Sequence, residues 1–313
     1  MQSKIFVSGS LAYDRIMDFS GYFADHILPE QTHALNVSFT VNGSVEKFGG
    51  TAGNIVYALS LLGETPIILA TIGHDYTRYF DWLNENQIAS DNIKIIKEEF
   101  TAVAYITTDK SNNQITWFNP GAMKYPSSFS FENVDVSKSQ VLIGPGNLDD
   151  MIDYSEACKD RSIGYIFDPG QSLPMWNKRD LIKCIDKCRV LISNSYELEL
   201  ILSLIECDIE ELLKLTTIIV TTLGKQGSRI CTPESKIEIP AAQPLNVVDP
   251  TGAGDAYRAG LIKGLIEGKD IAMCARMGSV SASFAIEHYG TQEYRFKAAE
   301  YDRRLNKLIG EAH

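Results

Sequence analysis

The chain carries little positive charge for its length. It has 29 lysines and arginines against 40 aspartates and glutamates, and the net charge of −11 disfavours general attraction to nucleic acid or an anionic membrane. It also lacks an uncharged apolar stretch approaching the ~18 residues that span a bilayer, and its first residues lack the apolar run of a signal peptide. We therefore expect a cytoplasmic protein without a nucleic-acid or membrane partner, which still allows a local basic pocket for a small anion.

Cysteine is too sparse to build a disulfide framework, with 6 in 313 residues. Cys184 and Cys188 lie one helical turn apart, but no histidine or second cysteine pair completes a zinc set. We interpret the cysteines as small apolar side chains in a reducing compartment. Glycine and proline are near ordinary usage and 44% of residues are hydrophobic, so the composition excludes collagenous and disordered classes and predicts a sizeable core.

Short apolar runs rich in β-forming residues alternate with segments of helical spacing. Such runs are typical of strands covered on both faces, and their alternation with helices indicates a parallel sheet of βα units. We predict one α/β domain over residues 1–313, with a mostly parallel sheet, helices on both faces and a small β lid. The predicted strands are residues 4–8, 66–72, 140–143, 164–168, 190–194 and 217–222, and the predicted helices are residues 53–62, 148–161, 178–187 and 196–204.

Two segments break this alternation. Residues 100–108 and 114–118 are predicted to be strands of a hairpin, because residues 109–113 form a turn-rich connection between them. Residues 27–47 are polar and β-prone, with Asn42-Gly43 as a turn signal. We expect the two insertions, about residues 14–48 and 98–124, to form the lid together. A second hairpin is predicted within the main domain, over residues 229–239.

Polar or glycine residues follow most of the predicted strands. Ligands of open α/β sheets bind outside the carboxyl ends of the strands. Each of these short segments alone is explained by a turn, but together they predict a cleft at one edge of the sheet. They are Gly9-Ser10, Gly73-His74-Asp75, Gly144-Pro145-Gly146, Asp168-Pro169-Gly170, Asn194-Ser195-Tyr196-Glu197 and Thr222-Leu223-Gly224.

The most informative segment is a glycine-rich loop that leads into a helix, from Val247 to Ala256. Gly252 and Gly254 allow the backbone to turn tightly and to approach a ligand. The free N–H groups of the helix start and the positive end of its dipole form an anion site, and Asp255 lies in the same first turn. The alternative is a helix-capping aspartate in a glycine turn, and two acids with two glycines in seven residues make that alternative the weaker one.

Other phosphate-binding motifs are missing. The chain has no G-x-x-x-x-G-K-[ST], which excludes a P-loop protein. The run after Gly252 lacks the third glycine of a dinucleotide fingerprint and comes late in the chain, which argues against a Rossmann dehydrogenase. No H-R-D or D-F-G set marks a protein kinase.

The segment from Asp249 to Asp255 resembles the C-terminal signature of the ribokinase-like (PfkB) family of sugar and nucleoside kinases. Three further motifs resemble those of the family and occur in the family's order. They are Gly49-Gly50-Thr51-Ala52-Gly53-Asn54, Asn194-Ser195-Tyr196-Glu197 and Thr222-Leu223-Gly224-Lys225-Gln226-Gly227. The resemblance implies a ribokinase-like fold and ATP-dependent phosphorylation of a primary hydroxyl group.

The resemblance also implies roles for residues at matching positions. Asp255 would be the catalytic base, and the backbone amides of Gly252, Ala253, Gly254 and Asp255 would form an anion hole. Helix N–H groups would keep Asp255 ionised. The implied residues of the ATP site are Asn194, Thr222, Gly224, Gly227 and Thr251. Mg²⁺ would be held through water by Asn194 and Glu197. The implied residues that bind the acceptor are Asp14, Gly49, Gly50 and Asn54. Some members hold a monovalent cation, K⁺, near the position of Asp249.

Several positions favour a nucleoside over a sugar as acceptor. Thr51-Ala52-Gly53 departs from the Lys-Gly-Ala of ribokinase proper. Three segments resemble the bacterial adenosine or broad-specificity nucleoside kinase branch, namely residues 255–260, Gly290-Thr291-Gln292 and Asp168-Pro169-Gly170-Gln171. The last of these makes Asp168 and Gln171 further candidates for binding the acceptor. In the predicted lid hairpin, Trp117 and Phe118 either cover a base or only pack the lid, and Met175 and Trp176 present the same alternative.

The leading hypothesis is therefore a nucleoside kinase that converts adenosine to its 5′-monophosphate with MgATP. A sugar kinase of the ribokinase or fructokinase type is the alternative within the family. A catalytically silent nucleotide-binding regulatory protein is a third hypothesis, which the intact Asp255 and glycine loop disfavour. The sequence leaves open whether the protein is a monomer or a homodimer.

Overall fold

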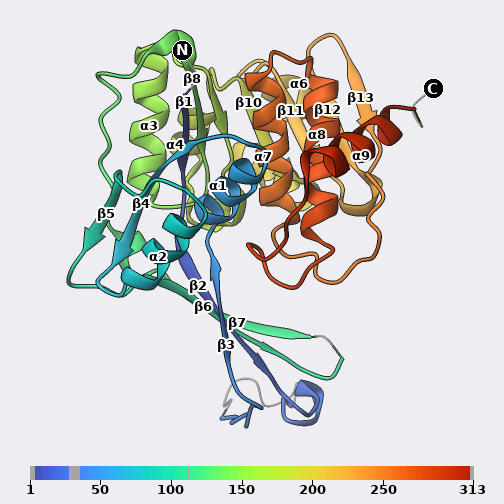
Figure 1. Ribbon diagram of the computed structural model, residues 1–313. Coiled ribbons are helices and arrows are strands. Elements are labelled where there is room, and N and C mark those ends of the chain that lie inside the picture. The colour runs from blue at the N-terminus through green and yellow to red at the C-terminus, as the bar shows by residue number, and fades with distance from the viewer. Residues whose placement is uncertain (1–3, 28–35, 112, 311–313) are drawn as a thin grey trace.

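A nine-stranded sheet forms the centre of the molecule (Figure 1), in a computed structural model that describes residues 4–27, 36–111 and 113–310. The strand order is β13-β12-β11-β10-β9-β8-β1-β4-β5, parallel from β11 to β5, with β12 and β13 antiparallel at one edge. Its strands are β1 (Lys4–Ser8), β4 (Pro66–Gly73), β5 (Ile93–Ile96), β8 (Ser139–Ile143), β9 (Tyr165–Phe167), β10 (Val190–Asn194), β11 (Ile219–Thr222), β12 (Ser228–Cys231) and β13 (Lys236–Ile239).

Alternate residues of the central strands face two separate cores. In β1, Ile5 and Val7 point to one core and Phe6 to the other, because successive side chains of a strand point to opposite faces. Helices α1 (Thr51–Leu61), α2 (Thr77–Glu85), α7 (Ala253–Ile266), α8 (Ile271–Ala285) and α9 (Ala298–Gly310) contribute to the first core. Helices α3 (Leu148–Asp160), α4 (Lys178–Ile185), α5 (Ser195–Ile205) and α6 (Ile209–Leu212) contribute to the second.

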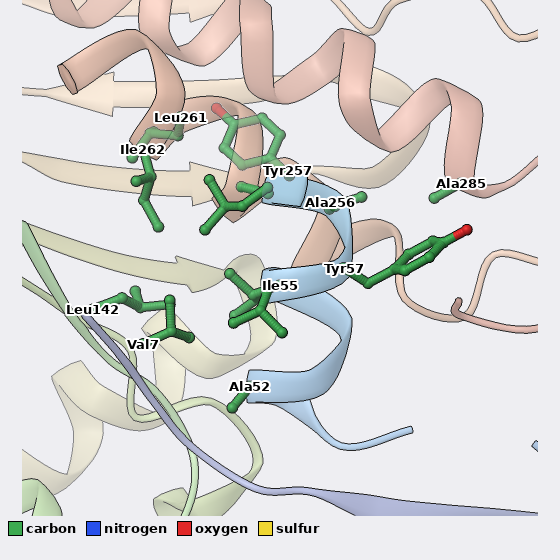
Figure 2. Packing of buried hydrophobic residues seen from close by; sticks show 14 of the residues in the cluster. Val7, Ala52, Ile55, Tyr57, Leu142, Ala256, Tyr257, Leu261, Ile262 and Ala285 are labelled. Atoms are coloured by element: carbon green, nitrogen blue, oxygen red, sulfur yellow. The ribbon is translucent and has the colours of Figure 1, made fainter. Parts of the chain in front are cut away.

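The predicted fold class is confirmed by this arrangement, an α/β fold with a mostly parallel sheet and helices on both faces. Figure 2 shows the first core, where Ile55 of α1 faces Val7 and Leu142 of the sheet, with Ile262 of α7 nearby. The hairpin predicted near residues 229–239 is present as β12 and β13. Within the described residues, every helix is too short or too polar to cross a bilayer.

A second sheet of four strands projects from the main body (Figure 1). Its order is β3-β2-β6-β7, from β2 (Ala12–Asp18), β3 (Val45–Gly49), β6 (Ala102–Thr108) and β7 (Gln114–Asn119). The hairpin expected near residues 100–118 is β6 and β7, and part of the polar segment 27–47 supplies β3, while residues 28–35 and 112 lie outside the described residues. The Asp109 carboxylate closes the β6–β7 connection by accepting hydrogen bonds from the backbone N–H groups of Ser111 and Asn113.

The two sheets meet where the chain passes from one to the other. Residues Gly9 to Leu11 connect β1 of the main sheet to β2 of the small sheet, and Gly50 connects β3 back to α1. The Ser10 hydroxyl accepts a hydrogen bond from the Thr51 backbone N–H, and the Thr51 hydroxyl donates to the Pro145 carbonyl oxygen. This junction therefore brings the carboxyl ends of β1 and β8 next to the start of α1.

Candidate active site

The glycine-rich loop ends at the N-terminus of α7, where backbone N–H groups are free to bind an anion, and this end of the helix is called the helix mouth below. Gly252 caps the helix with φ of +78°, a left-handed conformation that favours glycine, and Asp255 lies in the first turn. The Asp249 carboxylate fixes the loop by accepting hydrogen bonds from the backbone N–H groups of Thr251 (2.9 Å) and Gly290 (3.1 Å). Ala253 N–H donates to the Pro250 carbonyl oxygen at 3.3 Å, so in this arrangement the amides of Gly254 and Asp255 are the better placed for an anion.

Asp255 lies in an environment that raises its proton affinity. Burial, with smaller contributions from the charges of Asp168 and Asp14, raises the pKa of Asp255 to about 6, although Arg258 and a hydrogen bond from Asn54 oppose the rise. The Asn54 side-chain N–H donates to Asp255 Oδ2 at 2.7 Å. The carboxylate is therefore still mainly ionised at neutral pH and can accept a proton close to that pH.

A buried ion pair lies directly beside Asp255. Arg258 and Asp168 are only 7% and 1% exposed, and Arg258 Nε and Nη2 donate to the two oxygens of Asp168, the second at 2.8 Å. Burial alone would lower the pKa of Arg258, but the charge and hydrogen bonds of Asp168, together with the charges of Asp255 and Glu197, raise that pKa above its ordinary value, so the guanidinium stays charged. The candidate acceptor residue Asp168 thus lies at the site with both oxygens already bonded to Arg258.

Two adjacent cavities open at the helix mouth and share Thr222, Gly224 and Gly254. The first, of about 380 Å³, is polar and has Asp255 and Arg258 in its wall. The second, of about 430 Å³, is mainly apolar and runs between Gly227, Val247 and Ile286. The predicted residues in the wall of the first cavity are Asp168, Gln171, Asn194, Glu197, Thr222, Gly224, Gly252, Gly254 and Asp255. Those in the wall of the second are Thr222, Gly224, Gly227, Ala253 and Gly254.

Asn194 and Glu197 form the cap of helix α5. The Asn194 side chain accepts from the Glu197 backbone N–H, and Glu197 Oε2 accepts from the Asn194 backbone N–H, both at 2.8 Å. Burial raises the pKa of Glu197. The capping hydrogen bond uses only Oε2 of the Glu197 carboxylate, which leaves Oε1 for a water or a cation. Since the described residues contain no cluster of three metal-ligating side chains, a Mg²⁺ here would need water and phosphate oxygens to complete its ligands, and Mg²⁺ commonly binds in this way.

Asp14 occupies the inner end of the four-stranded sheet. Its carboxylate lies against the backbone of Gly49, the last residue of β3. Burial, with a contribution from Asp249, raises the pKa of Asp14 to about 6. The charge of Asp14 also raises the pKa of Asp255. Asn54 joins this group through its hydrogen bond to Asp255, and Gly50 is the N-cap of the helix that carries Asn54.

The strand register separates the two aromatic residues of β7. Asp14, Ala104 and Phe118 lie directly opposite one another on neighbouring strands and so share one face of the small sheet. Trp117 shares the other face with Tyr105 and Arg15. Phe118 is 48% exposed and Trp117 is 69% exposed, so neither is buried in the sheet's own packing.

Met175 and Trp176 differ in how far their side chains are exposed. Trp176 is buried, packs against Phe167 and donates its indole N–H to the Ser172 hydroxyl, so it belongs to the second core. Met175 is exposed.

Two residues with direct contacts at the site received no role from the sequence. Arg258 follows Asp255 by three residues and stands in segment 255–260, which the sequence singled out only for its likeness to a family branch. Gln292 donates a hydrogen bond to Asn54. It stands in a segment that the sequence singled out only for its likeness to a family branch.

The site combines the N-terminus of a helix, which can bind an anion, with a carboxylate that can take up a proton near neutral pH. Polar and apolar cavities adjoin both. This arrangement is suited to the transfer of a phosphoryl group to an alcohol. A sequence model of the pfkB family of carbohydrate kinases matches residues 9–297. The chain belongs to this family and is a phosphotransferase with an alcohol group as acceptor.

Similar proteins include both nucleoside and sugar kinases. The chain is 32% identical over 262 residues to a nucleoside kinase of Methanocaldococcus jannaschii, covering 82% of this chain and 85% of that protein. It is 26% identical over 253 residues to the ribokinase of Bacillus subtilis, covering 78% and 83%. The structure of Burkholderia thailandensis nucleoside kinase in complex with ADP-inosine superposes with a TM-score of 0.85 at 35% identity, covering 98% of this chain and 96% of that one.

Proposed function

We propose that this protein phosphorylates the 5′-hydroxyl of a nucleoside, with adenosine as the first substrate to test, using ATP and Mg²⁺. The observation that carries the proposal is the position of Asp255, which lies in the first turn of α7 at the wall of the polar cavity and accepts a hydrogen bond from Asn54. The similarity to nucleoside kinases from an archaeon and a bacterium supports the choice of acceptor.

In this proposal Asp255 accepts the proton of the acceptor hydroxyl as its oxygen attacks the terminal phosphoryl group. The amides of Gly252, Ala253, Gly254 and Asp255 face the charge that develops, and Ala253 must release the Pro250 carbonyl to take part. Holding the hydroxyl and the phosphoryl group in line can lower the activation free energy by ~7–11 kcal/mol. Each well-aimed amide can lower the activation free energy by a further ~3–4 kcal/mol, and the general base raises the rate ~10²–10⁴-fold.

The apolar cavity would hold the base and ribose of ATP, with its phosphates directed to the helix mouth. Thr222, Gly224 and Gly227 would line this cavity, and Asn194 from the wall of the polar cavity and Thr251 from the glycine-rich loop would complete the ATP site. Mg²⁺ would be held through water by Asn194 and by the second carboxylate oxygen of Glu197. When bound, the ion neutralises phosphate charge. A K⁺ ion beside Asp249 belongs to the same proposal, although both oxygens of that carboxylate already accept backbone amides and would have to be shared.

The acceptor would lie between the polar cavity and the inner end of the small sheet. Asp14, Asn54 and the backbone of Gly49 and Gly50 would hydrogen-bond the sugar hydroxyls. Phe118 shares a face with Asp14 and would cover the base, while Gln171 and Asp168 would border it from the main sheet, Asp168 through Arg258. We further propose that segments 14–48 and 98–124 act as a lid of a single-domain enzyme and exclude water, which limits wasteful ATP hydrolysis.

A coupled assay of ADP release tests the proposal. The panel contains adenosine, inosine, guanosine, cytidine and uridine, together with ribose and fructose, each with MgATP. We expect turnover with at least one nucleoside, adenosine first. Turnover with ribose or fructose and none with a nucleoside would establish the sugar kinase instead. No turnover with any acceptor, despite ATP binding, would favour the silent regulatory protein.

A further inference from the structure

A chain of hydrogen bonds reaches Asp255 from the first core of the protein. The Trp82 indole N–H donates to Gln292 Oε1 at 2.8 Å. Gln292 Nε2 donates to Asn54 Oδ1 at 3.0 Å, and Asn54 Nδ2 donates to Asp255 Oδ2 at 2.7 Å. Gln292 is only 1% exposed. The proposed function uses Asp255 and Asn54 but gives no task to Gln292 or Trp82.

The donor-only character of the indole decides how every amide in this chain is turned. An indole N–H cannot accept a hydrogen bond, so the group of Gln292 that faces Trp82 must be its carbonyl. The Gln292 NH₂ group then faces Asn54, which must present its own carbonyl in return. The NH₂ group of Asn54 is thereby directed at Asp255. Reversing either amide would bring two donors or two acceptors together.

Tyr79 holds Gln292 from a second side. Gln292 Nε2 donates to the Tyr79 hydroxyl at 3.2 Å, and that hydroxyl donates to the Gly49 carbonyl oxygen at 2.7 Å. Gly53 makes this approach possible, because a Cβ at residue 53 would lie 2.0 Å from the Tyr79 hydroxyl and 3.0 Å from Gln292 Nε2. The chain therefore links β3 of the small sheet to Asp255.

We propose that Gln292 is a positioning residue that sets the direction of the Asn54 carboxamide and so keeps an N–H donor on Asp255. This inference rests on the proposed function of Asp255 as the base. With its NH₂ group on the carboxylate, Asn54 orients Asp255 and favours its ionised form. With the amide reversed, the Asn54 carbonyl oxygen would face the carboxylate, which repels it and favours protonation.

Substitutions at residue 292 separate direction from mere packing. In Gln292→Glu a carboxylate replaces the NH₂ group, so Asn54 must turn its own NH₂ group toward residue 292 and its carbonyl toward Asp255. We expect kcat to fall about ten- to hundredfold, and the acid limb of the pH profile of kcat to move to higher pH, because the pKa of Asp255 rises both without the Asn54 donor and beside the new carboxylate. Gln292→Met, which removes the bonds without forcing a reversal, should give a smaller shift of that limb.

Tyr57→Phe is the matched control. Tyr57 donates a buried hydrogen bond to the Tyr294 carbonyl oxygen at 2.6 Å, two residues from Gln292, but has no bond to Asn54. This variant should lose thermal stability while keeping kcat within about twofold and its acid limb in place. If Gln292→Glu and Gln292→Met behave like Tyr57→Phe, or lose kcat with no movement of the limb, the positioning role is wrong.

A measurement without turnover tests the coupling itself. The shift in urea midpoint caused by Asp255→Asn is measured in the wild type and in Gln292→Met, which adds no charge of its own, and again with Asn54→Ala added to both. We expect different shifts in the first two backgrounds and equal shifts once Asn54 is removed. Equal shifts in all four would overturn the inference. An acceptor panel without turnover would instead overturn the proposed function, while this cycle would still decide whether Gln292 acts on Asp255 through Asn54.

Discussion

Replacing Arg258 by methionine would leave the Asp168 carboxylate buried without its cation. Arg258 and Asp168 are 7% and 1% exposed, and the two side chains meet through two hydrogen bonds. Methionine keeps the apolar stem of the side chain but not the guanidinium group, so the change removes the charge and the hydrogen bonds and retains the packing of the stem. Breaking a buried pair from one side costs about 3–5 kcal/mol, because the remaining ion is left uncompensated.

The same change should act on Asp255. Among the influences that lower the pKa of Asp255 the charge of Arg258 is the largest, and without it burial raises that pKa beyond about 6. A base whose pKa rises loses its ionised form at a higher pH. The acid limb of kcat/KM should therefore move to higher pH in Arg258→Met, and activity lost at pH 7 should partly return at pH 8.5.

Urea unfolding at pH 7 and a pH series of kcat/KM test these two effects separately. Arg229→Met is the control, since Arg229 pairs with Glu238 on the surface at 2.6 Å and its loss should cost less than about 1 kcal/mol. Adding Asp168→Asn to Arg258→Met removes the uncompensated charge and should recover part of the stability. A cost for Arg258→Met no larger than that of Arg229→Met would refute the argument from burial. An unmoved acid limb would refute the electrostatic link to Asp255.

Three further predictions follow from the site. In the wild type, kcat/KM should fall as the pH drops through about 6, because burial raises the pKa of Asp255 to about 6, and a profile flat down to pH 4.5 would contradict this. Asp255→Asn should stabilise the protein at pH 8 by up to about 3 kcal/mol, since an acid whose folded pKa is raised from 3.8 to about 6 costs stability above the folded pKa and none below the unfolded one. Urea unfolding should show the full gain at pH 8 and only a small part of it at pH 4. Phe118→Ala should raise the acceptor KM severalfold while Trp117→Ala leaves it nearly unchanged, as measured by initial rates, because only Phe118 shares a face with Asp14.

The sequence predicted the elements whose local pattern is strong. The expected strands at residues 4–8 and 190–194 match β1 and β10, because short runs of buried apolar residues bounded by polar ones leave few alternatives. The helix mouth at Gly252 was also predictable, since two glycines and two acids in seven residues specify both a turn and a helix start. Strand β2 was not predicted, because its residues Ala12–Asp18 show no clean alternation and are held by β3 and β6, which lie far along the chain.

The contacts around Asp255 could not be predicted in the same way. Arg258 and Asp168 are 90 residues apart in sequence, and Gln292 and Asn54 are 238 apart. Such pairs depend on how the helices are placed on the sheet, and no periodicity or motif spacing records that placement. The motifs indicated which segments meet at the site, whereas the direction of each side chain required the structure.

The most direct test of the account is the kcat of Asp255→Asn at saturating acceptor and MgATP. The substitution keeps the size of the side chain and its hydrogen bond from Asn54 but cannot take up a proton. We expect kcat to fall at least ~10²-fold with little change in KM and with cooperative unfolding retained. A variant that keeps kcat within about tenfold of the wild type would show that another group takes the proton, and Asp255 would lose its proposed role.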